Sequence, residues 1–281
     1  MNLMTSEFLY HAHAVGLSGR LTSPFAEVLE AQAPAAIGEA GGVSRSRAEN
    51  FRFQEIVSCK AAWSHVTGVE SVKNPGTFST LATSVIEGLN VLDMVTADRI
   101  VMRITSKHPG SGGGEPSIRF IGSSFENLRI AGQPVAVELD TVTFDELDTY
   151  SRLRERYLKD NGFRADLDRH LLRGGLEGIP AEKHRTRRYF ERFSGDAVVR
   201  ALETGGELRA SLVKGVRSGG AEIKAWGNVI EIPEFGLIRL AEITVGADHR
   251  SLSMLRIDLG CAYEGFIEGG SGAGNGRPWP A

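Results

Sequence analysis

Cysteine is scarce in this sequence, which contains only Cys59 and Cys261 among its 281 residues. Neither residue belongs to a spaced metal-binding or redox motif, and both lie in segments whose alternation is typical of strands. Two cysteines cannot form the multiple disulfides that stabilise small secreted domains. We therefore expect both side chains to be buried free thiols, which pack like small apolar groups.

Long apolar runs are absent as well. No segment approaches the roughly 18 apolar residues that a membrane-spanning helix requires. The opening segment, MNLMTSEFLYHAHAVG, lacks the basic start and the long apolar centre of a secretory signal peptide. The sequence therefore predicts a chain without a membrane span and with a cytoplasmic location.

A strong charge of either sign is also missing, since the formal net charge is −3. Nucleic-acid and membrane-surface partners normally require a strongly basic chain, so we do not expect nucleic acid as a partner. The charge is nevertheless uneven: residues 151–192 contain 12 Lys and Arg against 7 Asp and Glu, and the rest of the chain contains 20 against 28. This basic segment predicts a docking surface for an anionic partner or for another copy of the chain. Solvent-exposed helix faces would give the same pattern, because the long aliphatic parts of Lys and Arg side chains can cover apolar surface while the charges stay in water.

Three similar stretches recur along the chain: ENFRF at 49–53, EGLNV at 87–91 and ENLRI at 126–130. They are spaced by 38 and 39 residues, and each ends in an apolar, polar, apolar triplet with the period of a strand. LAEITV at 240–245 is a looser fourth copy. We predict a mainly β protein whose repeats stack as a β-solenoid or parallel β-helix-like body. Two alternatives stay open, namely chance similarity of β-rich segments, and a β-sandwich with a hairpin loop at 107–117.

Helical spacing replaces this pattern in the middle of the chain. TFDE at 143–146 has the form of a capping box, and the apolar residues that follow recur at intervals of three or four: Leu147, Tyr150, Leu153 and Tyr157. We predict a basic helical insertion at 143–194 in a β body formed by 1–142 and 195–267. Residues 268–281 are too rich in glycine to carry a core and predict a flexible or extended tail.

The candidate metal ligands are His11 and His13, two positions apart in LYHAHAVGLSG. On a strand both imidazoles point to the same side, where they could reach one metal ion, although no spacing recommends a third ligand. The opposite side is the expected core face and carries small and aromatic residues: Phe8, Tyr10, Ala12 and Ala14. The two histidines are then expected to face solvent, a sheet edge or another subunit.

The candidate partner-binding residues lie in the segment HRTRRYFERF at 184–193. They are its arginines and its tyrosine: Arg185, Arg187, Arg188, Tyr189 and Arg192. No Gly-x-Ser-x-Gly elbow and no phosphate-binding loop occurs in the sequence. We therefore predict no catalytic residues and no cofactor.

Several segments follow one another in a characteristic order: ATSVIEGLNVLDMVTADRI (82–100), GSSFENLRIAGQPV (122–135), and IPEFGLIRLAEITV with LSMLRIDLG and EGFIEGGS (232–271). In this order they resemble the choice-of-anchor P family of bacterial, β-rich proteins. The resemblance covers about half of the chain and implies a β-rich fold without catalytic residues. Secretion and surface anchoring, which are typical of that family, have no counterpart in this sequence.

Two functions from different classes fit these observations. The first is a non-enzymatic structural or interaction protein that self-associates or docks a partner through its β body and basic helical insertion. The second is an enzyme, either metal-dependent or acting on a polysaccharide, that uses a groove on the β body. The repeats, the uneven charge and the missing catalytic motif favour the first.

Overall fold

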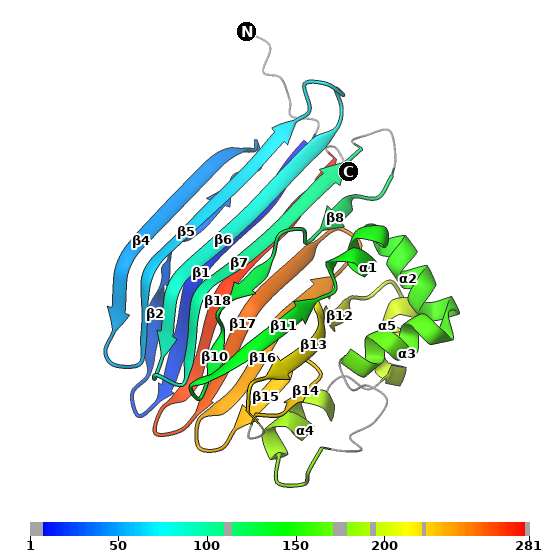
Figure 1. Cartoon of the computed structure of the whole chain (residues 1–281). Coiled ribbons are helices and arrows are strands. Elements are labelled where there is room, and N and C mark those ends of the chain that lie inside the picture. Colours follow the sequence, from blue (N-terminus) through cyan, green and yellow to red (C-terminus); the bar gives the residue numbers. More distant parts are fainter. Residues whose placement is uncertain (1–7, 110–113, 171–178, 192–194, 221–222, 279–281) are drawn as a thin grey trace.

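The computed structural model describes residues 8–109, 114–170, 179–191, 195–220 and 223–278. Two antiparallel β-sheets pack face to face, and helices lie to one side of them (Figure 1). The protein is therefore mainly β and sandwich-like, with a helical insertion. We call the two layers sheet A and sheet B.

Sheet A has nine strands and contains both ends of the described chain. Its order is β14, β15, β16, β17, β18, β1 and β2, with β12 beside β16 and β3 beside β1. The bounds are β1 (Phe8–Ser23), β2 (Glu27–Gln32), β3 (Ala35–Ile37), β12 (Leu208–Ser211), β14 (Ala225–Trp226), β15 (Val229–Ile232), β16 (Gly236–Val245), β17 (Arg250–Gly260) and β18 (Glu264–Pro278).

Sheet B also has nine strands. Its order is β13, β11, β10, β7, β6, β5 and β4, and β8 and β9 both pair with β7. The bounds are β4 (Gly42–Phe53), β5 (Val57–Glu70), β6 (Phe78–Val91), β7 (Val95–His108), β8 (Ser117–Arg119), β9 (Ser124–Glu126), β10 (Arg129–Ile130), β11 (Gln133–Leu139) and β13 (Val213–Ser218).

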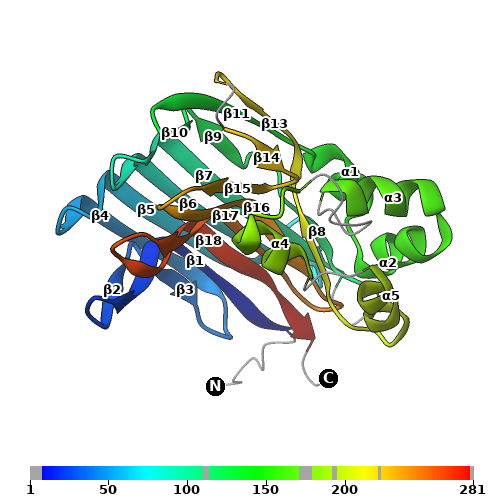
Figure 2. The same cartoon turned by 90° about the horizontal axis from the view of Figure 1, so that it is seen from below.

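The core fills the space between the sheets, where β1 faces β5 and β6 and β18 faces β6 and β7 (Figure 2). The sheets come very close here. A Cβ atom added to Gly16 would lie 2.8 Å from Cβ of Ala62, and the hydroxyl of Ser84 donates a 2.9 Å hydrogen bond to the carbonyl oxygen of Val15. The short distance between the sheets therefore requires small residues at the contact points on β1 and β18.

The predicted β-solenoid is wrong. All strand pairs of the described residues are antiparallel, and the three similar stretches are not stacked neighbours: ENFRF ends β4, EGLNV ends β6, and ENLRI runs from β9 to β10. Strands β5 and β7 lie between them. The spacing of 38 or 39 residues is that of one full hairpin in a meander, which a short repeat cannot distinguish from one turn of a solenoid.

The stretches do share one place in sheet B. Asn50, Gly88 and Asn127 have left-handed backbones, with φ of 51°, 62° and 49°. The strand registers place them in one line across the sheet, alternating with Lys60 and Asp98. We call these three residues the kink line. Left-handed residues within strands bend a sheet locally, as β-bulges do.

Side-chain alternation shifts by one residue at the kink line. On β6, Leu89 and Ile86 are both buried although they are three positions apart. Sheet A bends in the same way at Ala33, Ala241 and Gly270, whose φ angles are 53°, 46° and 66°. The looser stretch LAEITV contains Ala241. The similar stretches in the sequence therefore mark the positions at which antiparallel strands bend.

The kink line is tested by Asn50→Val, which is expected to lower the free energy of unfolding by about 1–3 kcal/mol, because a β-branched residue is strained at positive φ. Asn50 is exposed, so lost packing contributes little. Asn50→Gly is the control and should stay within about 0.5 kcal/mol of the parent, since glycine adopts this backbone freely. Urea unfolding followed by circular dichroism measures both, and equal stability of the two variants would contradict the assignment.

Five helices lie between β11 and β12 in the described residues: α1 (Thr141–Glu146), α2 (Tyr150–Lys159), α3 (Asn161–His170), α4 (His184–Glu191) and α5 (Gly195–Glu203). The predicted insertion at 143–194 is therefore too short at both ends. Thr143 is not a helix cap, because α1 begins earlier and its N-cap, Asp140, accepts a 3.1 Å hydrogen bond from the Thr143 amide. At the other end, α5 buries Leu202 in the core.

The predicted glycine-rich tail is also wrong, because its described part belongs to β18 in the middle of sheet A. This strand pairs with β17 on one side and with β1 on the other. Its glycines allow close packing, since a Cβ atom on Gly272 would overlap the Met102 side chain of sheet B. Residues 279–281 lie outside the described part of the chain.

The two cysteines agree in part with the expectation of buried free thiols. Cys59 is a buried free thiol, and burial raises its pKa to about 11, so it is protonated at neutral pH. Cys261 is free but only half-buried.

Within the part of the chain that the structure describes, no helix has the length and apolar character needed to cross a membrane.

Candidate functional site

The two predicted metal ligands lie on the outer face of sheet A. Phe8, Tyr10, Ala12 and Ala14 are buried, as the alternation predicted, and His11 and His13 are exposed on the other side of β1. Across the strand pair His11 lies opposite Asn275, and His13 lies opposite Ala273.

The metal hypothesis stays a prediction. The ring centroids of His11 and His13 are 6.0 Å apart. Among the described residues no group of three His, Cys, Asp or Glu side chains is arranged to hold a metal ion. Partial desolvation on this face of the sheet, together with the neighbouring His11, lowers the pKa of the exposed His13, so this imidazole is neutral at neutral pH.

The predicted partner-binding residues divide over the surface of α4. Tyr189 is buried against sheet A, and Arg185 and Arg188 are exposed on the helix. Arg187 donates a 2.9 Å hydrogen bond to the carbonyl oxygen of Ile179, and Arg192 lies outside the described residues. The helix therefore buries two aromatic residues, Tyr189 and Phe190, and does not present a single basic cluster.

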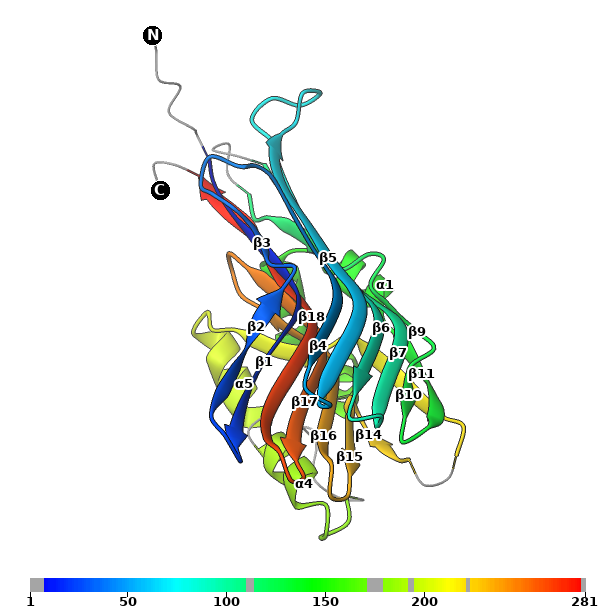
Figure 3. The same cartoon turned by 90° about the vertical axis from the view of Figure 1, so that its left-hand side faces the viewer.

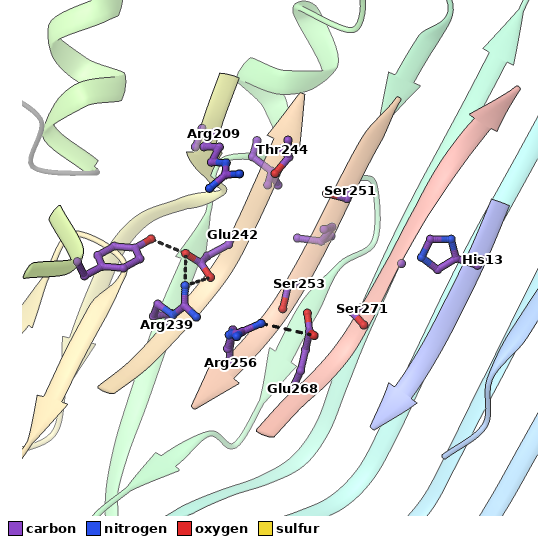
Figure 4. A pocket seen from close by; sticks show the side chains of 15 residues that line it. His13, Arg209, Arg239, Glu242, Thr244, Ser251, Ser253, Arg256, Glu268 and Ser271 are labelled. Carbon is purple, nitrogen blue, oxygen red and sulfur yellow. Dashed lines mark hydrogen bonds and ion pairs between the residues drawn. The ribbon is translucent and has the colours of Figure 1, made fainter. Parts of the chain in front are cut away.

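A cavity of about 360 Å³ lies between α4 and β1 on the outer face of sheet A (Figure 4). Tyr189 and His13, which sequence reasoning placed in two separate candidate sites, stand at opposite sides of it. The floor is formed by short side chains, several of them hydroxylated: Ala210, Thr244, Ser251, Ser253, Ser271 and Gly272. Charged residues surround this floor: Arg209, Arg239, Glu242, Arg256 and Glu268.

Tyr189, Glu242 and Arg239 form a buried network on one wall. The Tyr189 hydroxyl donates a short hydrogen bond to Oε1 of Glu242, and the Arg239 guanidinium lies 3.0 Å from Oε2 of Glu242 and 3.1 Å from Oδ2 of Asp258. Burial raises the pKa of Tyr189, and the negative charge of Glu242 raises it further. Burial acts to lower the pKa of Arg239, but Glu242 and Asp258 outweigh it and the net pKa is raised. Tyr189 therefore stays protonated and Arg239 stays charged near neutral pH.

Arg256 forms the lower wall. Its guanidinium lies 4.2 Å from the ring centroid of Phe266, 3.4 Å from Oδ1 of Asp258 and 4.0 Å from Oε2 of Glu268. The last distance is at the limit of an ion pair, so the carboxylate of Glu268 keeps most of its capacity to accept hydrogen bonds.

Two buried polar atoms of the cavity residues lack a hydrogen-bond partner among the described residues: Nε of Arg239 and Oγ of Ser253. Arg209 is exposed at the rim and forms no ion pair within the described chain. Buried polar groups in folded proteins nearly always have partners, so unpartnered atoms in a hollow indicate capacity for a ligand or ordered water.

A second cavity of about 380 Å³ follows the first along β1, and His11 lines it. Asn275 also lines this cavity; it is 2% exposed, and its Oδ1 atom has no hydrogen-bond partner among the described residues. The other ionisable side chains of the lining are those of Glu39, Asp248, His249 and Arg277. Since His11 and His13 are two positions apart on β1, the two cavities lie next to each other along this strand, and we call this pair of neighbouring cavities the trough.

Most of the charged trough residues were missed in the sequence. Arg239 and Glu242 are three positions apart, so simple alternation places them on opposite faces of β16, as it does Ser253 and Arg256 on β17. The bend at Ala241 brings both members of each pair to the outer face. The available signal is a pattern of polar, small or apolar, small or apolar, polar, seen in RLAE, SMLR and EGGS.

Comparison with known proteins gives one family. No curated protein and no solved structure matches this chain. The resemblance to the choice-of-anchor P family is not tested by these comparisons and stays a prediction. Residues 8–246, which run from the start of β1 to just past the end of β16, match a family model. The chain therefore belongs to the family described as Domain of unknown function (DUF8256).

Proposed function

We propose that the protein is a non-enzymatic interaction protein that docks a polar, anion-bearing partner in the trough, where the β body meets the helical insertion. The observation that supports it best is that Nε of Arg239 and Oγ of Ser253 are buried in one cavity without a hydrogen-bond partner among the described residues, beside the exposed guanidinium of Arg209. A bound partner would satisfy the two buried atoms, each of which otherwise carries a desolvation penalty of about 1–3 kcal/mol, and would pair with Arg209 at the rim.

The lining suggests the chemistry of the partner. Carboxylates of Glu242 and Glu268 accept hydrogen bonds from hydroxyl groups, and Arg209 and Arg256 bind carboxylates. Each cavity falls in the range of about 300–1,000 Å³ that small ligands occupy, and two such cavities in sequence favour an extended ligand. An acidic oligosaccharide carries both hydroxyl and carboxylate groups at regular intervals, and it is the ligand class of this proposal.

The experiment is isothermal titration calorimetry with oligogalacturonate as the probe, and with a neutral cello-oligosaccharide and an acidic peptide for comparison. Saturable binding of oligogalacturonate is expected to weaken about tenfold or more in Arg209→Glu, which corresponds to about 1.4 kcal/mol. The matched control is Arg217→Glu on β13, an exposed arginine outside the trough. Equal affinity in the two variants, or no binding of the acidic oligosaccharide, would contradict the proposal.

A polysaccharide-acting enzyme is the second candidate, because two carboxylates, Glu242 and Glu268, line the same trough. Glycosidic bond hydrolysis commonly uses one carboxyl group as an acid and another as a base or nucleophile. Release of reducing ends from a polysaccharide, abolished in Glu268→Gln, would favour this candidate over simple binding. The predicted cytoplasmic location belongs to the same proposal, and fractionation of the source cells tests it.

A further inference from the structure

Both sheets have a free edge on the same side of the molecule. In the described residues β2 and β3 pair only with β1, and β4 pairs only with β5 (Figure 3). The edge of sheet A spans residues 27–37 and that of sheet B spans 42–53, so the two edges are similar in length. An unpaired edge presents a row of backbone donors and acceptors that another strand can bind.

The two edges carry opposite charges. The sheet A edge has Glu27 and Glu30, both exposed, and no basic residue. The sheet B edge has three exposed arginines and one glutamate: Arg45, Arg47, Arg52 and Glu49. The formal charges are therefore −2 on one edge and +2 on the other.

Each edge also exposes a large apolar side chain. Val28 on β2 is 69% exposed and Val43 on β4 is 61% exposed. Exposed valines on an edge strand are unusual, because edge strands normally carry charged residues that discourage pairing. On these two strands the charges discourage only some pairings: β4 against β4 would place arginines together, and β2 against β2 would place glutamates together.

The direction of the strands is suitable as well. The chain reverses between β3 and β4 through an antiparallel bridge from Gly38 to Gly41, so β4 runs opposite to the edge of sheet A. A two-fold rotation about an axis parallel to the strands leaves strand directions unchanged, so β4 of one copy is antiparallel to the sheet A edge of the other. It also brings sheet A of one copy beside sheet B of the other at both junctions, which is an isologous arrangement.

We propose that two copies of the chain associate side by side, with the β2–β3 edge of each copy hydrogen-bonded to β4 of the other. Both sheets then continue across the dimer, and the acidic edge of one copy faces the basic edge of the other. Strand addition of this kind takes its strength from main-chain hydrogen bonds and its selectivity from side chains. The association goes beyond the ligand binding proposed above, and the trough, which opens on the outer face of sheet A, can be intact in either state.

Sedimentation velocity over a concentration series tests the association. The parent protein is expected to form a dimer of the 30.4 kDa chain, which dissociates as salt is raised because the paired charges are at the surface. A strictly monomeric particle at all concentrations and at low salt would overturn the proposal.

Charge reversal tests the pairing of the edges. Glu27→Arg with Glu30→Arg makes both edges basic, and Arg45→Glu with Arg47→Glu makes both edges acidic. Each double variant alone is expected to be monomeric where the parent is a dimer. An equimolar mixture of the two is expected to form a heterodimer, and the quadruple variant a homodimer, because both junctions again join opposite charges.

Folding is checked by circular dichroism and thermal unfolding, and the four positions are exposed, so all variants should fold. A homodimer of either double variant, or failure of both the mixture and the quadruple variant to associate, would show that these edges do not meet. Ligand binding in the trough is measured separately on the same variants, so failure of one proposal leaves the other testable.

Discussion

Gly272→Val is expected to lower the free energy of unfolding by about 3 kcal/mol or more, or to prevent folding. A Cβ atom at this position would overlap the Met102 side chain of the opposite sheet and lie 2.7 Å from the carbonyl oxygen of His13 on β1. The methionine can move, but the backbone carbonyl is held by the pairing of β1 with β18. Overpacking of this kind forces backbone shifts that are costly in a close-packed interior.

Strand propensity predicts the opposite result, because valine is favoured in strands and glycine is not. The matched control is Gly215→Val on β13, where the nearest atom to an added Cβ is 4.0 Å away. That variant is expected to equal or slightly exceed the parent in stability. Denaturant unfolding of both variants separates the two effects, and a stable Gly272→Val protein would show that the sheets are not as close as described.

Arg250→Ala is expected to cost about 3–5 kcal/mol, because this arginine is 1% exposed and connects elements far apart in the chain. Its guanidinium donates hydrogen bonds of 2.8 Å and 3.0 Å to the carbonyl oxygens of Ile118 and Leu147. Burial lowers its pKa to about 10, opposed by Asp148 and other nearby acids, so the side chain is still charged at neutral pH.

The matched control is Arg152→Ala, which removes another guanidinium beside the same acid. Arg152 lies 3.3 Å from Oδ1 of Asp148, but its side chain is 66% exposed. Exposed ion pairs contribute about 0–1 kcal/mol, so this variant should be close to the parent. Thermal and urea unfolding measure both variants, and similar losses in the two would show that burial of Arg250 contributes nothing special.

Individual strands could be predicted from the sequence, and their order could not. Alternation predicted the core face of β1 correctly, since Phe8, Tyr10, Ala12 and Ala14 are buried. Pairing between distant segments has no local signal, and nothing in LYHAHAVG indicates that Tyr10 lies opposite Gly276. The prediction for the glycine-rich end was wrong because a high glycine content usually indicates a flexible segment, whereas the glycines of β18 allow sheet A to pack closely against sheet B.

The candidate site was accessible only in part for a similar reason. Tyr189 and His13 were identified from their own neighbourhoods, and the structure brings them to one cavity. Arg239 and Glu242 could not be assigned to the same surface, because their shared orientation depends on the left-handed backbone of Ala241. A residue of this backbone type is usually signalled by glycine or asparagine, and alanine gives no such signal.

Ala241 and Gly270 are both buried, yet they determine which polar side chains reach the outer face of sheet A. The composition of the trough lining is therefore determined in part from the interior, by residues that do not line either cavity. In a related chain whose strands do not bend at these positions, the same charged residues would be divided between the core and the solvent. Core packing and the outer face of sheet A are therefore coupled in this fold, and a substitution at Ala241 or Gly270 is expected to alter which polar side chains line the trough.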